Sequence, residues 1–130
     1  MKILIGYDGS EASKQAIDIA KKYAHTRSAE LYILTVVDGG RHAVLEVYQK
    51  AKADLSFAKR SIVTENLHCT AILSAEGLEP GEELVQFAKL NSIDLIIVGI
   101  RKRSKMGKLL FGSNAQYIIL EAPCPVLTVK

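Results

Sequence analysis

The sequence predicts a single α/β domain, with a five-stranded parallel sheet covered by helices on both faces. Short apolar runs alternate with amphipathic segments along the whole chain, and most of these runs are continuously apolar. Parallel strands need helical crossovers and are buried on both faces, so both features favour a doubly wound sheet. A chain of 130 residues can bury one core of its own. We therefore expect residues 1–130 to form one domain.

The first half of the chain supplies two strong helix signals. Ser10 is a suitable helix N-cap, and Glu11 places a carboxylate at the positive end of the helix dipole. The longest helical pattern runs from about His42 to Glu65, where apolar residues recur at alternating steps of four and three. The expected strands of this half are residues 2–6, 31–37 and 69–73.

The second half of the chain continues the alternation of predicted strands and helices. Pro80 fits the first turn of a helix, where its missing N–H costs nothing. Ser113 is the expected N-cap of the last helix, which Pro123 ends. The expected strands of this half are residues 95–98 and 126–129.

Composition narrows the class of protein. Hydrophobic residues make up 48% of the chain and charged residues 24%, and no apolar run approaches the roughly 20 residues of a membrane helix. The first residues lack the pattern of a signal peptide, so we expect a cytoplasmic protein. Cys69 and Cys124 lack C-x-x-C spacing and are interpreted as structural thiols that form no disulfide with each other.

A basic segment between glycines is the main functional candidate. Gly99 opens it and Gly112-Ser113 close it just before the last predicted helix. Glycine allows a backbone to approach a ligand closely, and a helix N-terminus favours anions, so this segment is a candidate phosphate site. The alternative is a solvated, charged loop. The cationic residues are Arg101, Lys102, Arg103, Lys105 and Lys108.

Asp8 is a second candidate, because it directly follows the first predicted strand. In open parallel sheets, ligands bind at the carboxyl ends of strands near a switch in strand order, and Asp8, residues 36–38 and Gly99 all fall at such ends. The alternative role of Asp8 is a turn or capping carboxylate. The three histidines have no nucleophile or paired acid at readable spacing, and the P-loop and dinucleotide-binding motifs are not matched.

Four segments in order resemble the universal stress protein family, over essentially the whole chain. They are ILIGYDGS at residues 3–10, TVVD at 35–38, DLIIVG at 94–99 and PCPVLTVK at 123–130. The ATP-binding pattern of this family is G-x2-G-x9-G-[S/T]. Gly99, Gly112 and Ser113 match it at the correct spacing, whereas Lys102 occupies the position of the middle glycine.

The resemblance implies a strand order of 3-2-1-4-5 and a homodimer formed through the last strand. It also implies a nucleotide site in which Asp8 lies beside the nucleotide and the backbone at Val36 meets the adenine. A Mg²⁺ ion that accompanies ATP is expected near Asp8. The residues expected to bind the nucleotide are Tyr7, Asp8, Val36, Gly99, Arg101, Lys102, Gly112, Ser113 and Asn114.

The resulting functional prediction is a cytoplasmic stress-response regulator that binds ATP or another adenine nucleotide. It would act by ligand-dependent ordering of the basic segment and by contacts with its dimer mate or with an unidentified regulatory protein. The alternative is a dimeric interaction module of the same fold that binds no nucleotide. Enzymatic activity is the weaker hypothesis, at most slow ATP hydrolysis, because no general base is visible in the sequence. Neither a membrane nor a nucleic acid is expected as a partner.

Overall fold

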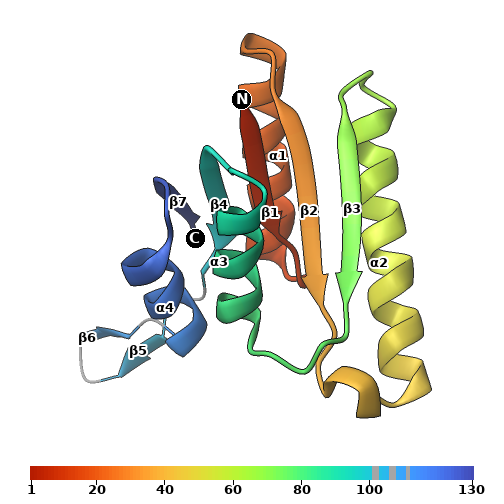
Figure 1. Cartoon of the computed structure of the whole chain (residues 1–130), viewed down its shortest axis with the longest axis vertical. Coiled ribbons are helices and arrows are strands. Elements are labelled where there is room, and N and C mark those ends of the chain that lie inside the picture. Colours follow the sequence, from red (N-terminus) through yellow and green to blue (C-terminus); the bar gives the residue numbers. More distant parts are fainter. Residues whose placement is uncertain (101–102, 106–107, 111) are drawn as a thin grey trace.

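Five parallel strands form one sheet in the order β3-β2-β1-β4-β7 in the computed structural model (Figure 1). The chain winds from β1 outward to β3, returns to the other side of β1 with β4, and ends at β7. The predicted doubly wound fold and strand order are therefore confirmed. The structure describes residues 1–100, 103–105, 108–110 and 112–130. The strands of the sheet are β1 Lys2–Gly6, β2 Glu30–Val36, β3 Cys69–Ser74, β4 Leu95–Gly99 and β7 Val126–Val129.

Helices cover both faces of the sheet (Figure 1). Successive residues of a strand point to opposite faces, so Ile3 and Ile5 of β1 pack towards one pair of helices and Leu4 towards the other. Helices α1 and α2 lie on the first face, and α3 and α4 on the second. No helix in the described part of the chain is long and apolar enough to span a membrane. The helices are α1 Glu11–Thr26, α2 Leu45–Val63, α3 Pro80–Leu90 and α4 Ser113–Glu121.

The strand order changes direction between β1 and β4. Their register pairs Gly6 with Val98, so the two strands end side by side. The connection after β1 leads to α1 on one face, whereas the chain after β4 reaches α4 on the other face. Chain segments that diverge in this way leave room at the carboxyl edge, which is the lower edge of the sheet in Figure 1.

Two predicted helix starts differ from the structure. Helix α2 begins at Leu45 instead of about His42, because Gly39 and Gly40 have left-handed φ angles of 86° and 56° and residues 40–42 form a 3₁₀ turn. Helix α4 begins at Ser113, so its N-cap is Gly112 and not Ser113 as predicted. The Gly112 carbonyl already accepts the first helical hydrogen bond, from the N–H of Gln116.

The basic segment contains a short hairpin where the sequence suggested only a loop. Strands β5 (Arg103–Lys105) and β6 (Lys108–Leu110) pair antiparallel, with Arg103 opposite Leu110. Two residues separate them, the commonest length of a hairpin connection. Arg101 and Lys102 lie outside the described residues. The predicted ordering of this segment by a ligand therefore stays a prediction.

The two cysteines lie at opposite edges of the sheet. Cys69 begins the edge strand β3, and Cys124 precedes the other edge strand, β7. Both are free thiols, as predicted. Each is partly buried and packs against a different core cluster, and burial raises the pKa of Cys69 to about 11. A thiol with so high a pKa is almost entirely protonated at neutral pH and is a poor nucleophile.

Candidate functional site

A cleft of about 190 Å³ opens where β1 and β4 end, and we call it the switch-point cleft. Its apolar wall combines the ends of β2 and β4 with α3 and α4. Its other wall contains the turn from β1 to α1. A wider groove of about 750 Å³, between the loops after β2 and β3, adjoins it and shares Asp8, Val36 and Pro80. The residues that line the cleft are Gly6, Tyr7, Asp8, Ser13, Leu34, Val36, Pro80, Leu84, Val98, Gly99, Asn114, Ala115 and Ile118.

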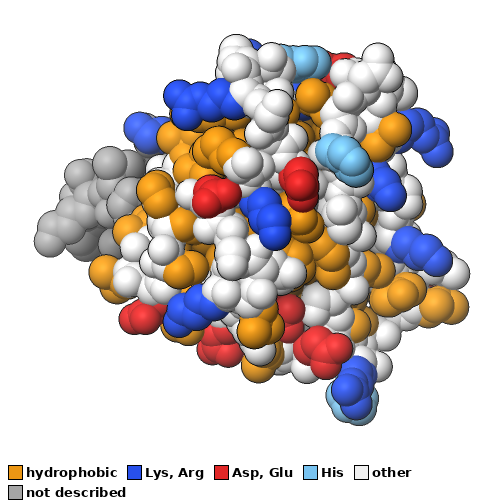
Figure 2. All heavy atoms as spheres, turned by 45° about the horizontal axis from the view of Figure 1, so that its top comes forward, with side chains coloured by type: hydrophobic (Ala, Val, Ile, Leu, Met, Phe, Trp, Pro, Cys, Tyr) orange, Lys and Arg blue, Asp and Glu red, His pale blue; other side chains and the backbone are white. Residues whose placement is uncertain are grey.

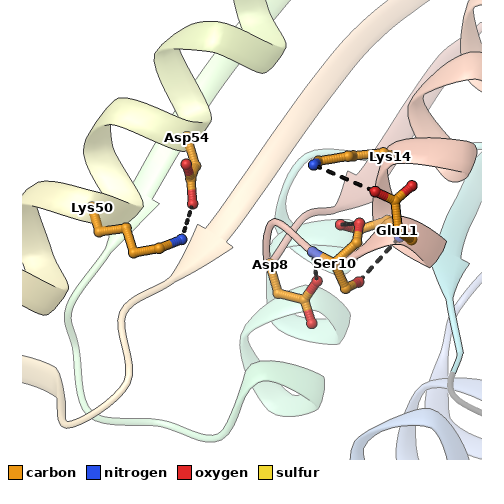
Figure 3. Close-up of polar contacts among 7 residues, drawn as sticks. Asp8, Ser10, Glu11, Lys14, Lys50 and Asp54 are labelled. Carbon is orange, nitrogen blue, oxygen red and sulfur yellow. Dashed lines mark hydrogen bonds and ion pairs between the residues drawn. The ribbon is translucent and has the colours of Figure 1, made fainter.

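Asp8 has a structural role in addition to its place in the cleft. Its Oδ1 accepts a hydrogen bond from the N–H of Ser10 at 2.9 Å, which holds the turn that leads into α1 (Figure 3). Ser10 in turn caps α1, because its Oγ accepts the N–H of Ser13 at 3.2 Å. The turn-carboxylate alternative is therefore correct for one oxygen. The side chain as a whole is exposed and borders the cleft.

Gly99 is required by packing against α1. A Cβ atom at this position would lie 2.4 Å from the backbone C of Ala12 and 2.6 Å from the backbone N of Ser13. Backbone atoms cannot move aside as a flexible side chain can. The absence of a side chain therefore lets β4 approach the first turn of α1. The same glycine lines the switch-point cleft.

Asn114 joins the two helices that cover the cleft. Its Oδ1 accepts the N–H of Gly81 at 2.9 Å, in the first turn of α3. A side chain at Gly81 would be crowded, since its Cβ would lie 3.0 Å from the Asn114 carbonyl oxygen. Asn114 therefore supplies a capping acceptor to α3 from the start of α4. Sequence reasoning proposed Asn114 as a ligand contact only and missed this role.

The N-terminus of α4 differs from those of the other helices around the cleft. Ser10 caps α1, and Asn114 satisfies an N–H of α3. In the described structure, the N-cap of α4, Gly112, makes no side-chain capping bond, and Ser113 is exposed. The first N–H groups of a helix have no partner within it and carry partial positive charge. The start of α4 can therefore accept an anion.

The structure brings together most of the residues predicted to bind a nucleotide. Tyr7, Asp8, Val36, Gly99 and Asn114 all line the cleft. Gly112 and Ser113 are exposed and directly precede Asn114 in the sequence, and Arg101 and Lys102 lie outside the described residues. The sequence analysis missed the contributions of α3 and of the apolar strand ends. Helical periodicity indicated a buried face for α3 but not that this face closes the cleft. The missed residues are Gly6, Ser13, Leu34, Pro80, Leu84, Val98, Ala115 and Ile118.

Metal binding would need a ligand that brings the ion. Within the described ranges, no three His, Cys, Asp or Glu side chains are grouped so that they could hold a metal ion. Asp8 alone offers a carboxylate at the cleft. Mg²⁺ commonly binds one or two carboxylates together with substrate phosphates, so one aspartate fits a metal carried by a nucleotide.

Charge is distributed evenly over the described surface seen in Figure 2, where cationic and anionic side chains are interspersed. The formal net charge of the chain is +3. Five of its 17 cationic residues fall between residues 101 and 108. The excess positive charge is therefore local in the sequence and adjoins the start of α4.

Comparison with known proteins identifies the family. The model of the Universal stress protein family matches residues 1–130. The chain belongs to the universal stress protein family. Among family members of known sequence, one encoded in the 3′ region of the QAH/OAS sulfhydrylase gene of Thermus aquaticus is 31% identical over 134 residues. That alignment covers 98% of this chain and 97% of the relative.

Solved structures of universal stress proteins share the same architecture. One from Archaeoglobus fulgidus is 32% identical, superposes with a TM-score of 0.87, and is matched over 100% of this chain and 93% of its own. A second structure of an Archaeoglobus fulgidus universal stress protein, in complex with dAMP, is 30% identical with a TM-score of 0.84. That match covers 100% of this chain and 98% of the relative.

Proposed function

We propose that this universal stress protein binds ATP or another adenine nucleotide in the switch-point cleft and belongs to the ATP-binding subgroup of its family. One observation carries the proposal: an apolar wall and a helix N-terminus without a side-chain cap border the same cleft. A nucleobase has apolar faces and a phosphate is an anion, so a nucleotide satisfies both. The dAMP complex of a relative 30% identical to this chain supports the same class of ligand.

The proposed orientation follows the chemistry of the lining residues. The base lies against Val36 and Leu34, and the ribose lies between Asp8 and Gly99. The phosphates extend to Gly112 and Ser113, where the N–H groups of α4 begin. A Mg²⁺ ion bound to ATP would be held by phosphate oxygens and the Asp8 carboxylate.

The basic segment supplies the cationic part of the site in this proposal. Arg101 and Lys102 lie two and three residues after Gly99 in the sequence. Lys102 replaces the second glycine of the family pattern, and its ammonium would contact the phosphates as a point charge. Nucleotide binding would order this segment and so change the surface offered to a partner protein. The protein would act as a cytoplasmic stress-response regulator, with ATP hydrolysis at most slow.

A homodimer formed through β7 is the second part of the proposal. Strand β7 is an edge of the sheet, and unpaired edges tend to be covered in folded proteins. Three large hydrophobic residues of the preceding helix α4 are also exposed, Tyr117 at 39%, Ile119 at 46% and Leu120 at 78%. These residues favour an interface near that edge, which is also what the alternative, a dimeric module without nucleotide, requires.

Sedimentation of a Leu127→Lys variant tests the dimer. The substitution places a charge in β7, and across a two-fold axis two such charges would lie near each other. We expect the wild type to sediment as a dimer at tens of micromolar and the variant as a monomer with unchanged helical circular dichroism. A monomeric wild type would overturn the dimer and remove the main support of the alternative function.

Mass spectrometry of gently denatured protein, purified without added nucleotide, tests the binding proposal. We expect bound ATP, ADP or AMP in the wild type and its loss in Asp8→Ala, with Asp18→Ala on the exposed surface of α1 as the matched control. If neither a co-purified nor a saturating added nucleotide is retained, the alternative function is preferred. ATP turnover above background in the presence of Mg²⁺ would instead support the enzymatic hypothesis.

A further inference from the structure

A second hollow of about 230 Å³ lies on the opposite face of the sheet, and we call it the α2 hollow. It lies between the first turns of α2 and the ends of β1 and β2. Tyr7 belongs to the core cluster of the α1–α2 face, whereas Leu34 belongs to the cluster of the α3–α4 face. The hollow and the switch-point cleft adjoin at the carboxyl edge of the sheet, where Tyr7, Asp8 and Val36 line both. The residues that line the hollow are Tyr7, Asp8, Thr35, Val36, Val37, Asp38, Val47, Lys50, Ala51 and Asp54.

The hydroxyl of Tyr7 has no hydrogen-bond partner among the described residues, although the residue is only 5% exposed. No fully buried polar side-chain atom in the described structure lacks a partner, so this oxygen must reach open space. Burial raises the pKa of Tyr7, and the carboxylates of Asp54 and Asp8 raise it further while Lys50 lowers it. Tyr7 and these three charged groups all line the α2 hollow, and Tyr7 also lines the switch-point cleft.

The charge of the hollow is negative. Its lining includes three carboxylates, from Asp8, Asp38 and Asp54, and one ammonium, from Lys50, which gives a formal charge of −2. Lys50 Nζ and Asp54 Oδ2 pair at 2.8 Å on α2, across the end of β2 from Asp8 (Figure 3). Asp54 also reaches the β1–α1 turn, since a Cβ on Gly9 would lie 3.0 Å from its Oδ2.

The remaining lining of the hollow is apolar. Val37, directly after β2, and Val47 of α2 line it, with Ala51 one turn further along the helix. A ligand that fits must therefore combine positive charge with hydrocarbon. The carboxylates are too dispersed for a metal ion, because no three acidic, His or Cys side chains of the described residues form a metal-binding group.

We propose that the α2 hollow binds a small organic cation, a primary ammonium on a short apolar chain. The ammonium donates hydrogen bonds to the Tyr7 hydroxyl oxygen and to the carboxylates, and the chain packs on the valines and Ala51. Such a ligand supplies the missing partner of Tyr7 and offsets the negative charge. This site shares Tyr7, Asp8 and Val36 with the nucleotide cleft but differs from it in charge and in ligand.

Titration with n-hexylammonium, followed by ¹H–¹⁵N NMR without any nucleotide, tests this proposal independently of the nucleotide site. We expect saturable shifts at the amides of Tyr7, Val37 and Ala51, with a dissociation constant of about 1 mM for so small a ligand. n-Hexanol and hexanoate, which match the chain but lack the positive charge, should bind at least about tenfold more weakly. Equal binding of all three compounds, or no saturable shift with n-hexylammonium, would overturn the proposal.

Two matched pairs of variants locate the site. Ala51→Leu fills the hollow and should abolish binding, whereas Ala53→Leu, on the exposed side of the same helix, should leave it unchanged. Tyr7→Phe keeps the ring but loses the hydroxyl and should weaken binding about fivefold, with Tyr48→Phe as its control. A thermal melt will show whether a variant is unfolded. In that case the remaining pair of variants tests the location of the site. Unchanged affinity in folded Ala51→Leu and Tyr7→Phe would place the cation elsewhere and refute the assignment.

Discussion

The two glycines that frame the basic segment serve different purposes. Gly99 has no space for a side chain, because a Cβ would lie 2.4 Å from the backbone of α1. At Gly112, by contrast, a Cβ would meet no described atom within 4 Å, and the φ angle of −63° suits any residue. Both positions match the same sequence pattern. Packing therefore explains why residue 99 is glycine. It does not explain Gly112, which leaves ligand binding as the reason for that glycine.

Within this one motif, one glycine is required for folding and the other is better explained by ligand binding. A glycine that packing requires is needed whether or not a ligand binds, so it says little about function. A glycine in open space beside a helix N-terminus has no structural requirement in the described residues. Gly112 and Ser113 are therefore the better indicators of an anion site.

The largest expected effect is on folding, from Gly99→Ala. Because its Cβ would meet the backbone at Ala12 and Ser13, we expect a loss of about 3 kcal/mol in the free energy of unfolding. This corresponds to a fall of about 10 °C in melting temperature. Gly112→Ala is the control and should change stability by less than about 1 kcal/mol. Thermal denaturation checks both, and equal melting temperatures would show that the comparison is wrong.

Ser113→Asp should separate binding from stability. A carboxylate in the first turn of α4 interacts favourably with the helix dipole and should raise stability by about 0.5 kcal/mol. The same charge repels phosphate, so ATP affinity measured by calorimetry should fall at least about tenfold. Ser113→Asn keeps the site neutral and is the matched control. Unchanged affinity in the aspartate variant would move the phosphates away from α4.

Loss of the helix-to-helix contact should have a smaller effect. Asn114→Ala leaves the N–H of Gly81 without its side-chain acceptor, so we expect a destabilisation of about 1 kcal/mol in urea denaturation. Asn114→Asp keeps an acceptor oxygen and should recover most of that loss. If the alanine variant is as stable as the wild type, the contact contributes little to the stability of the fold.

The smallest effect is expected far from the cleft, at Glu65. Hydrogen bonds from His25 and Lys21 lower the pKa of Glu65 below its ordinary 4.5. Glu65 therefore contributes stability that is present above pH 4.5 and is lost as the pH falls through the lowered pKa. Melting temperatures of Glu65→Gln should lie slightly below the wild type at pH 6 and converge with it at pH 3. Nucleotide affinity should not change in this variant.

The fold was predictable because the signals were local and redundant. Continuous apolar runs such as Leu95–Val98 identify buried parallel strands, and Pro80 identifies a helix start. The boundaries were less predictable. The late start of α2 depends on two left-handed glycines, at positions 39 and 40, whose φ angles no periodicity reveals.

The site was predictable only in part because its other contributions are tertiary. The contact between Gly99 and α1, and the hydrogen bond from Gly81 to Asn114, join residues far apart in the sequence. The helical pattern of α3 identified a buried face without indicating that it closes a cleft. The unpartnered hydroxyl of Tyr7 is visible only once α2 is placed beside β1 and β2.

A titration of the uniformly ¹⁵N-labelled wild-type protein with AMP and then ATP, followed by NMR, tests the central claim most directly. We predict saturable amide shifts at Asp8, Val36, Gly99 and Gly112–Ala115, with larger changes for ATP than for AMP at the start of α4. Amides around Lys50 on α2 should remain unchanged. An absence of shifts at millimolar nucleotide, or shifts confined to residues away from the carboxyl edge of the sheet, would contradict nucleotide binding in the switch-point cleft.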